Sequence, residues 1–481
     1  MTILPMDLKG ATALVIGLGR SGRAAARLAL KRGARVIGTD TRDAQALRAP
    51  LAEIQGEWFC GGHENVPWQD ATLIIVSPGV PPLQELALAV ERGVPVVSEL
   101  EFASQQLSAP VVAIGGTNGK STTTMLVAEL LQRAGLAVFS GGNLGTPLSE
   151  LLLDDERVVS SQHAVTNSRT VPGAGEKRAA DVAVVEVSSF QLERSPTFRP
   201  RVSALLNISE DHLDRYPTFQ SYANAKGNAF TAQTQDDVAI VPVGDAACLS
   251  QARRGGGSVV TFGKGGAYEV QSGALHVRAR GAVQQAPLTK LALHGAHNLL
   301  NLSAAVACVD AFLELSDKRG EDWIAQSERL TVFCEAASAF QPLAHRMTRV
   351  RERSGVCYYD DSKATNVGAA VTAIRGLAEP KCVLIAGGRD KHGSYDELVA
   401  ALRDRGRAVV LIGEAADRLA EAISEATPIA RASGMEAAVR IAADLDQSVD
   451  AVLLSPACSS LDMFSSYAER GVRFNDAVNG L

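Results

Sequence analysis

One stretch of this 481-residue chain, residues 110–125, constrains its fold more than any other. Val111 to Ile114 form a short apolar run that predicts a buried strand. Gly116-Thr-Asn-Gly-Lys-Ser-Thr122 follows directly, and apolar residues then recur at helical spacing as far as Arg133. A strand, a glycine-rich turn and a helix that begins at Lys120 predict an α/β unit whose backbone N–H groups face an anion.

The residues of this turn suit the phosphates of a nucleotide. Lys120 would reach the terminal phosphates, and the hydroxyl of Ser121 or Thr122 would be available to Mg²⁺. The match to the general phosphate-loop pattern is imperfect, because Ile114 stands where that pattern has glycine. The alternative is a turn that binds nothing, which the three glycines beside Gly-Lys-Ser disfavour.

Length and composition predict a cytoplasmic protein of about three domains, at roughly 150 residues each. A net charge of -6 and the lack of a basic stripe argue against nucleic-acid binding. The seven cysteines include no Cys-x-x-Cys pair and are expected to be reduced. The first residues do not resemble a signal peptide, and no uninterrupted apolar stretch approaches the roughly 18 residues of a membrane span.

The N-terminal segment carries a second glycine-rich turn. A strand over residues 11–16 leads into Gly17-Leu-Gly-Arg-Ser-Gly22, and a second strand ends at Asp40. Alone, this pattern indicates NAD, but its mechanics require only a diphosphate at a helix N-terminus and an acidic residue beside a sugar or base. A UDP-sugar meets both requirements, so NAD and UDP both stay open. A further strand ends at Ser77-Pro-Gly79, where the alternative is an ordinary turn.

Polar residues follow the predicted strands of the central segment. Asn143 follows a strand that ends in glycines, and Glu186 lies in an apolar strand, where a carboxylate suits Mg²⁺ or, alternatively, faces solvent. Asp211, His212 and Asp214 lie within four residues of one another. This cluster indicates either a metal or phosphate site or the acidic first turn of a helix.

Three further features of the central segment are less specific. Lys226 on a predicted helix is, from its pattern alone, a solvated side chain. Asn298 and Asn301 lie three apart on one helical face and suit an adenine edge. Residues 159–181 are polar and predict a mobile surface insertion.

The C-terminal third alternates apolar strand patterns with helical ones, which predicts another parallel, doubly wound sheet. Polar clusters stand at the strand ends: Asp360 to Asn366, Gly387 to Lys391 and Ser455 to Asp462. His345-Arg346 lies at the predicted hinge, where a guanidinium would reach an ATP phosphate.

Taken in order, these motifs resemble the Mur ligases, which couple ATP cleavage to amide-bond formation. The phosphate loop alone resembles the folylpolyglutamate synthetases as well. The run Asp361-Ser-Lys-Ala-Thr-Asn366 resembles the D-glutamate-adding branch of the Mur ligases. The resemblance covers the whole chain and implies three mainly parallel, doubly wound α/β domains: a Rossmann-like UDP-substrate domain (1–109), a central P-loop ATPase domain (110–341) and a Rossmann-like amino-acid domain (342–481).

This resemblance implies an ATP-dependent ligase of peptidoglycan synthesis, acting as a monomer on UDP-N-acetylmuramoyl-L-alanine, D-glutamate and ATP with two Mg²⁺ ions. The implied catalytic residues are Lys120, His212 and Lys226, and the implied metal ligands are Ser121, Glu186, His212 and a carbamylated Lys226. ATP would be held by Gly116, Thr117, Asn118, Gly119, Lys120, Ser121, Thr122, Asn298, Asn301, Arg346 and Asp361. The UDP substrate would be held by Gly19, Arg20, Ser21, Gly22, Asp40, Thr41, Arg42, Ser77, Pro78, Gly79, Asn143, Ser188 and Gln191, and D-glutamate by Lys363, Thr365, Lys391, Ser460 and Tyr467.

Two other functions compete with this interpretation. A folylpolyglutamate-type ligase shares the chemistry but would not need a diphosphate-binding domain before the phosphate loop. An NAD-dependent oxidoreductase joined to a P-loop module would explain the first turn, although nothing further along the chain resembles a dehydrogenase site.

Overall fold

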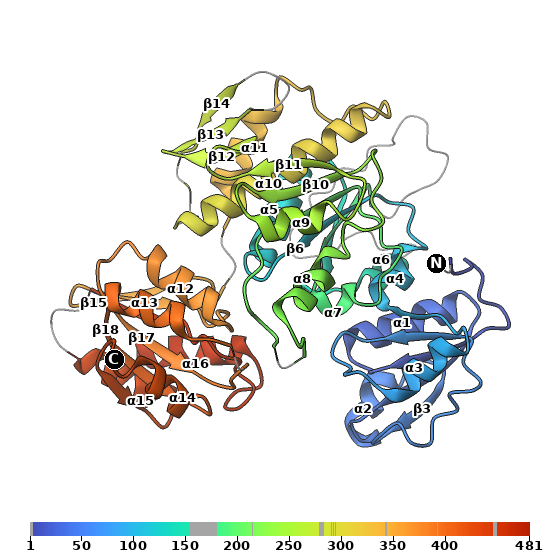
Figure 1. The fold of residues 1–481 in the computed structure, drawn as a ribbon, viewed down its shortest axis with the longest axis horizontal. Helices are drawn as coiled ribbons and strands as arrows, with labels where there is room; N and C mark the ends of the chain where they lie inside the picture. The colour runs from blue at the N-terminus through green and yellow to red at the C-terminus, as the bar shows by residue number, and fades with distance from the viewer. Residues whose placement is uncertain are drawn as a thin grey trace. The chain divides into compact units, whose positions relative to one another are not determined.

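The computed structural model describes residues 3–481 except 154–179, 214, 279–282, 290, 292, 294, 342–343, 392 and 446–449. Three sheets follow one another along the chain, each with helices packed beside it (Figure 1). The predicted three-domain, mainly parallel α/β fold is confirmed. The predicted insertion at 159–181 lies almost entirely outside the described residues.

The chain divides into two compact units. The first comprises residues 1–207, 223–289 and 301–338, and holds the first two sheets. The second comprises residues 208–222, 290–300 and 339–481, and holds the third sheet. Residues 208–222 therefore belong with the third sheet, although the preceding strand belongs to the second.

The first sheet has five parallel strands in the order β3-β2-β1-β4-β5. Its elements are β1 Thr12–Ile16, α1 Arg20–Lys31, β2 Arg35–Asp40, α2 Ala44–Leu51, β3 Glu57–Cys60, β4 Leu73–Val76, α3 Gln84–Glu91 and β5 Val96–Ser98. The strand order reverses between β1 and β4. Ligands of open α/β sheets bind at the carboxyl ends of the strands at such a reversal, which is where Gly17 and Ser77 lie.

The second sheet has nine strands in the order β14-β13-β12-β11-β10-β9-β6-β8-β7. It is parallel from β7 to β12, and β13 and β14 extend it as antiparallel strands. Its strands are β6 Val111–Gly115, β7 Val138–Gly142, β8 Val182–Glu186, β9 Val202–Leu205, β10 Val238–Pro242, β11 Ser258–Phe262, β12 Tyr268–Gln271, β13 Ala274–Val277 and β14 Gln284–Pro287. Helix α4 Glu99–Ser104, which precedes this sheet, packs against β4 and β5 of the first sheet. The helices of the second sheet are α5 Lys120–Arg133, α6 Leu148–Leu151, α7 Ser189–Leu192, α8 Phe219–Gly227, α9 Ala246–Ala252, α10 Ala296–Asp317 and α11 Arg329–Ala339.

The third sheet has six strands in the order β15-β16-β20-β17-β18-β19, of which β15 alone is antiparallel to its neighbour. Its strands are β15 Thr348–Arg353, β16 Val356–Asp360, β17 Cys382–Gly387, β18 Gly406–Ile412, β19 Ile429–Arg431 and β20 Ala451–Leu454. Its helices are α12 Val367–Gly376, α13 Asp396–Arg405, α14 Ala416–Ile423, α15 Met435–Asp444 and α16 Tyr467–Asn479.

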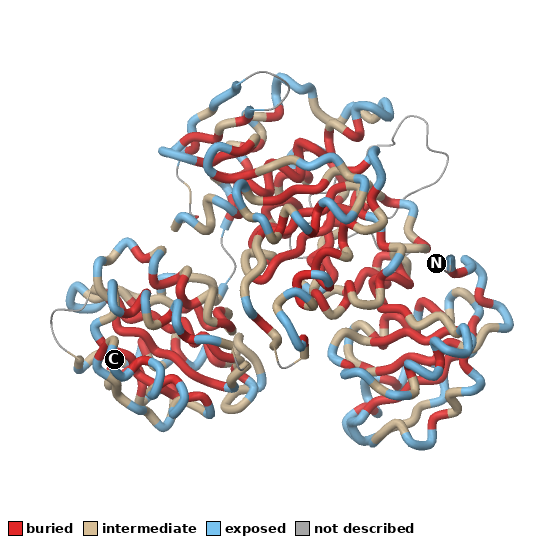
Figure 2. The backbone as a smooth tube through the Cα atoms, viewed as in Figure 1, coloured by how far each residue is buried: buried red, intermediate tan, exposed pale blue. Residues whose placement is uncertain are grey.

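Burial on both faces explains why the strands are nearly continuous apolar runs (Figure 2). In β17, Val383 and Ile385 pack with Phe474 of α16 on one face of the third sheet. Leu384 and Ala386, which alternate with them, pack on the other face with α12 and α13. Polar groups at the strand ends are thereby fixed to a rigid scaffold.

Helix α10 is the one helix of the described chain that is long and apolar enough to cross a membrane by length and composition. Of its most apolar window, 78% is buried inside the protein, including Leu302, Val306 and Phe312. Its apolar composition is therefore that of a core helix.

Candidate active site

The loop between β6 and α5 is fixed by hydrogen bonds to its own backbone. Asn207, just after β9, accepts hydrogen bonds from the backbone N–H of Thr117 (3.0 Å, carbonyl oxygen) and of Asn118 (2.9 Å, Oδ1). The Nδ2 group of Asn207 donates in return to the Asn118 carbonyl at 3.1 Å. Asn207 is a supporting residue that the motif analysis missed, and its only sequence signal is a polar residue at the end of an apolar strand.

Two lysines converge on the first glycine of this loop. Lys120 Nζ donates to the carbonyl oxygens of Gly116 (3.0 Å) and Thr117 (2.8 Å). Lys226 Nζ, from α8, donates to the same Gly116 oxygen at 2.7 Å. Lys226 is only 4% exposed. The solvated surface lysine predicted by the bare helix pattern is therefore wrong, and Lys226 lies under the phosphate loop.

The helices around the loop supply further predicted nucleotide contacts. Asn301 of α10 lies against Gly119, where an added β-carbon would be 2.3 Å from the Asn301 Oδ1 atom. Asn298 lies one turn earlier on the same helix, in the second compact unit. Ser121 and Thr122 are buried in the first turn of α5.

The chemistry of the available donors fits Mg²⁺. Glu186 ends β8, beside Ile114 of β6, and is 3% exposed. Its Oε1 atom accepts a hydrogen bond from Asn143 Nδ2 at 2.7 Å. A carboxylate and the Ser121 hydroxyl are the oxygen ligands that Mg²⁺ takes when it also binds substrate phosphates. Among the described residues, no group of three or more acidic, histidine or cysteine side chains is placed to hold a metal ion by itself.

His212 belongs to the second compact unit, whereas Lys226 and Glu186 belong to the first. His212 has a left-handed backbone, with φ of 56°, and its backbone N–H donates to Asp211 Oδ1 at 3.0 Å. Asp214, the third member of the predicted cluster, lies outside the described residues.

Asp211 links His212 to predicted D-glutamate residues. Its Oδ1 atom also accepts from Lys391 Nζ at 2.9 Å, and its Oδ2 atom accepts from Asn366 Nδ2 at 3.1 Å. The residue beside the predicted metal ligand is thus joined to the third-sheet loops.

Around the first sheet, the predicted UDP residues gather at the carboxyl ends of three strands: Gly19, Arg20, Ser21 and Gly22 after β1, Asp40, Thr41 and Arg42 at and after β2, and Ser77, Pro78 and Gly79 after β4. Ser77 Oγ donates to the Gly17 carbonyl at 2.6 Å and joins two of these loops. The Arg20 guanidinium lies beside Gly145, where an added β-carbon would be 3.5 Å from its Nη1 atom. That second-sheet loop also carries Asn143.

Asp40 is engaged by the protein itself. Its carboxylate accepts the Leu18 N–H at 2.7 Å, the Arg42 N–H and Nε–H at 2.9 Å, and Arg42 Nη2–H at 2.7 Å. Burial opposes ionisation, but the hydrogen bonds from Arg42 and Leu18 lower the pKa of Asp40 to about 2. Asp40 therefore holds the glycine-rich loop and orients Arg42.

Ser188 and Gln191, also predicted to contact the UDP substrate, form the cap of α7. Ser188 Oγ accepts the Gln191 N–H at 3.3 Å, and Gln191 Oε1 accepts the Ser188 N–H at 3.0 Å. This reciprocal pair satisfies the first turn of the helix.

The predicted D-glutamate residues belong to neighbouring loops of the third sheet. Lys363 Nζ lies 4.9 Å from the centre of the Tyr467 ring, and the His345 ring meets the same ring edge-on at 6.4 Å. Thr365 follows Lys363 on the loop after β16, and Ser460, which follows β20, is 3% exposed.

Asp361, a predicted nucleotide residue, lies in the same loop region. Burial raises its pKa to about 7, although Ser455 Oγ donates to its Oδ2 atom at 2.9 Å and the Arg346 charge opposes the rise. A carboxyl group with such a pKa changes charge near neutrality.

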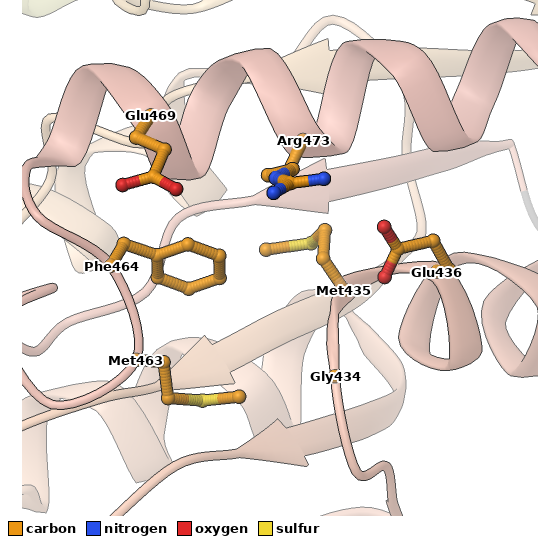
Figure 3. Close-up of a pocket in the computed structure, with 7 residues that line it drawn as sticks. All are labelled: Gly434, Met435, Glu436, Met463, Phe464, Glu469 and Arg473. Carbon is orange, nitrogen blue, oxygen red and sulfur yellow. The ribbon is translucent and has the colours of Figure 1, made fainter.

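A cavity of about 280 Å³ near this region holds none of the predicted residues (Figure 3). Its lining is Gly434, Met435, Glu436, Met463, Phe464, Glu469 and Arg473. It borders the chain between Ser460 and Tyr467 without including either.

Three family models match successive parts of the chain: "Mur ligase MurD-like, N-terminal domain" at residues 11–98, "Mur ligase middle domain" at 114–309 and "Mur ligase, glutamate ligase domain" at 345–458. The chain is 41% identical to the UDP-N-acetylmuramoylalanine–D-glutamate ligase of Trichlorobacter lovleyi, over 99% of this chain and 100% of that protein. It is 40% identical to the enzyme of the same name from Pelobacter propionicus, with the same coverage.

Solved structures agree in fold. MurF of Thermotoga maritima in complex with ADP gives a TM-score of 0.57 at 17% identity, covering 100% of this chain and 97% of that one. The folylpolyglutamate synthase of Mycobacterium tuberculosis complexed with ADP gives 0.54 at 19% identity, covering 81% of this chain and 93% of that one. Both similarities concern the fold alone.

Proposed function

This chain belongs to the Mur ligase family, and on that basis we propose that it joins D-glutamate to UDP-N-acetylmuramoyl-L-alanine at the expense of ATP. The structural observation that carries the proposal is the loop over Gly116–Gly119, which Asn207 holds by hydrogen bonds and which follows β6, the strand that pairs with the Glu186 strand β8. We place the reaction among the cytoplasmic steps of peptidoglycan synthesis and assign it to a monomer.

The reaction takes place in two transfers. The carboxylate of the muramoyl-alanine substrate attacks the γ-phosphoryl group of ATP, which forms an acyl phosphate and releases ADP. The amine of D-glutamate then attacks the acyl carbon, loses a proton, and expels phosphate as the amide bond forms. Positioning and charge stabilisation by the protein are the main requirements.

The phosphate loop supplies the positioning of ATP. The loop N–H groups and the start of α5 would face the phosphates, and Lys120, which donates to the loop carbonyls in this structure, would bind the γ-phosphate of ATP. Ser121 and Glu186 would hold Mg²⁺, with His212 and Lys226 at a second ion, and the metal would neutralise charge on the transferring group. Further contacts to the nucleotide would come from Asn298, Asn301, Arg346 and Asp361.

We further propose that Lys226 is carbamylated in the active enzyme. As an ammonium it shares the Gly116 oxygen with the Lys120 ammonium, and two neighbouring cations disfavour each other. A carbamate replaces that like-charge contact with an anionic oxygen donor, which a metal can bind. The burial of Lys226 shields such a group from solvent.

The glycine loop after β1 and the Arg42 side chain hold the UDP substrate, with Asp40 acting through both. Asn143, on the loop after β7, and Arg20, at the start of α1 and beside that loop, would contact the same substrate. The carboxylates and the carbon chain of D-glutamate would be held by five side chains of the third-sheet loops and α16: Lys363, Thr365, Lys391, Ser460 and Tyr467.

The competing functions are disfavoured by similarity along the sequence. The N-terminal segment matches a MurD-like domain model, so its glycine turn has a counterpart other than an NAD site. The folylpolyglutamate synthase shares the fold at 19% identity, whereas the D-glutamate ligases share about 40% of residues over the full length.

Phosphate release from the purified chain tests the proposal. We expect turnover only when ATP, UDP-N-acetylmuramoyl-L-alanine and D-glutamate are all present, and none when L-alanine or diaminopimelate replaces D-glutamate. Lys120→Ala should remove turnover from a folded protein. Turnover with a folate acceptor, or alcohol-dependent absorbance of reduced nicotinamide, would overturn the proposal in favour of the competing functions.

A further inference from the structure

Arg470 is the largest fully buried side chain described in this chain. It lies on α16 and is 0% exposed. Its guanidinium donates hydrogen bonds to three backbone carbonyl oxygens: Ser362 (2.8 Å), Cys458 (3.1 and 3.2 Å) and, more weakly, Gly387 (3.5 Å). Burying a cation is unfavourable unless hydrogen bonds offset the loss of its hydration, and these carbonyl oxygens supply such bonds to the Arg470 guanidinium.

The three carbonyls belong to three separate loops at the carboxyl ends of adjacent strands. Ser362 follows β16, Cys458 follows β20 and Gly387 ends β17, and these strands are neighbours in the sheet. One planar guanidinium therefore connects three chain segments that lie far apart in the sequence. Its fixed fork suits this better than a flexible ammonium.

The same three loops carry the proposed D-glutamate residues. Lys363 directly follows Ser362, Ser460 lies two residues after Cys458, and Lys391 lies four residues after Gly387. Tyr467 lies one turn before Arg470 on α16.

Close packing leaves this arrangement little freedom. Gly388 has φ of +131°, and a β-carbon there would lie 2.1 Å from the Ser459 carbonyl oxygen and 3.2 Å from Arg470 Nη1. Arg389 and Ser459 exchange backbone hydrogen bonds of 2.9 and 3.0 Å, which join the loops after β17 and β20. The bond from Arg470 to Ser362 adds the loop after β16 to this pair.

The charge of Arg470 suits an acidic ligand. Burial lowers its pKa to about 10, so the guanidinium remains protonated at neutral pH. A positive charge beneath loops that present Lys363 and Lys391 favours a ligand with two carboxylates.

We propose that Arg470 is a positioning residue for the amino-acid substrate: it holds the loops after β16, β17 and β20 in register so that Lys363, Lys391 and Ser460 form one site for a dicarboxylic amino acid. The proposal rests on the proposed D-glutamate ligase function and adds a residue that touches no substrate.

Arg470→Met tests this, since methionine keeps much of the length and has no donors. Misplacing binding groups by about 1 Å costs up to roughly 100-fold. We expect the KM for D-glutamate to rise 10- to 100-fold by that estimate, with the KM for ATP and for the UDP substrate within about twofold of wild type. Trapping of the acyl phosphate by hydroxylamine needs no D-glutamate and should continue at close to the wild-type rate.

Arg473→Met is the matched control, because Arg473 lies one turn further along α16 and is exposed at the cavity in Figure 3. It should leave all three KM values unchanged. Arg470→Lys, which keeps the charge but loses the fork, should give a smaller rise in the KM for D-glutamate, and it carries the test if Arg470→Met does not fold.

An unchanged KM for D-glutamate in a folded Arg470 variant, or equal changes for all three substrates, overturns the positioning role. A loss of acyl-phosphate trapping overturns it too, because the defect then precedes D-glutamate. A wild-type protein that turns over without D-glutamate overturns the proposed function itself, and that result is read before any variant is made.

Discussion

In the glycine-rich turn after β1, we expect one glycine substitution to affect mainly substrate binding and another to affect mainly the stability of the fold. Gly19, the N-cap of α1, and Gly22, in the first turn of α1, lie three residues apart, but their surroundings differ. A β-carbon on Gly22 would lie 1.9 Å from the Gly17 carbonyl oxygen, whereas a β-carbon on Gly19 would meet nothing within 4 Å. Gly19 also has an ordinary extended backbone, with φ of -67°. The open space beside Gly19 is where a diphosphate would approach the start of α1.

The stability effects follow from these contacts. Gly19 is the N-cap of α1, where alanine is less favourable than glycine by up to about 1 kcal/mol. Alanine also restricts the unfolded chain, which returns about 0.4–1 kcal/mol. Gly19→Ala should therefore change the free energy of unfolding by less than about 0.5 kcal/mol. Gly22→Ala forces a backbone carbonyl to move and should destabilise by roughly 1–3 kcal/mol.

Binding should respond in the opposite order. A methyl group at Gly19 displaces the diphosphate from a backbone donor, and a hydrogen bond to a charged group contributes about 1.5–3 kcal/mol. The KM for the UDP substrate should rise by roughly 10- to 100-fold in Gly19→Ala, while the KM for ATP stays constant.

Urea unfolding and steady-state kinetics on both variants check these values. A stable Gly19→Ala enzyme with an unchanged KM for the UDP substrate would refute the anion-binding role of the loop. A Gly22→Ala protein as stable as the wild type would refute the packing argument.

Substitutions at three other residues extend these expectations. Lys226→Ala should lose at least 10-fold in turnover, with partial rescue by acetate or formate, and Lys226→Arg should stay impaired because guanidinium forms no carbamate; full activity of Lys226→Ala would exclude the metal role. Asp40→Ala should raise the KM for the UDP substrate but not for ATP, because it releases Arg42 and the glycine loop; equal effects on both substrates would contradict this. Glu99→Gln should flatten the pH dependence of stability between pH 4.5 and about 7, as measured by urea unfolding.

The sign of the Glu99 effect follows from proton linkage. Burial raises the pKa of Glu99 from 4.5 to about 7, although the Ser149 N–H donates to its Oε1 atom at 2.7 Å. Between these values the folded protein keeps a proton that the unfolded chain releases, so the free energy of unfolding falls as pH rises. At about 1.4 kcal/mol per pH unit, the loss approaches roughly 3 kcal/mol above pH 7. A Glu99→Gln protein with the same pH slope as wild type would show that Glu99 ionises normally.

The sequence allowed the local units to be predicted, because a strand, a glycine turn and a helix start are encoded within about fifteen residues. It did not predict β3, β5, β10–β15 or β19, and most of these strands are short or carry polar residues on a half-exposed edge, so their apolar runs are weak. Supporting residues could not be predicted for a different reason. Asn207 binds Asn118 across 89 residues and Lys226 binds Gly116 across 110, and no local pattern records such a contact.

These supports bear on how the enzyme distinguishes its substrates. Asp40 holds the loop after β1, Asn207 and Lys226 hold the loop after β6, and Arg470 holds the loops of the third sheet. Each of these side chains hydrogen-bonds to loop backbone in this structure, so it fixes the shape of the loop or loops that it joins. Because the loop after β1, the loop after β6 and the third-sheet loops are held by different side chains, a change in one support should alter the affinity for one substrate and leave the others intact. Selectivity for the incoming amino acid can therefore be altered at the third sheet without disturbing the phosphate loop that all Mur ligase reactions require.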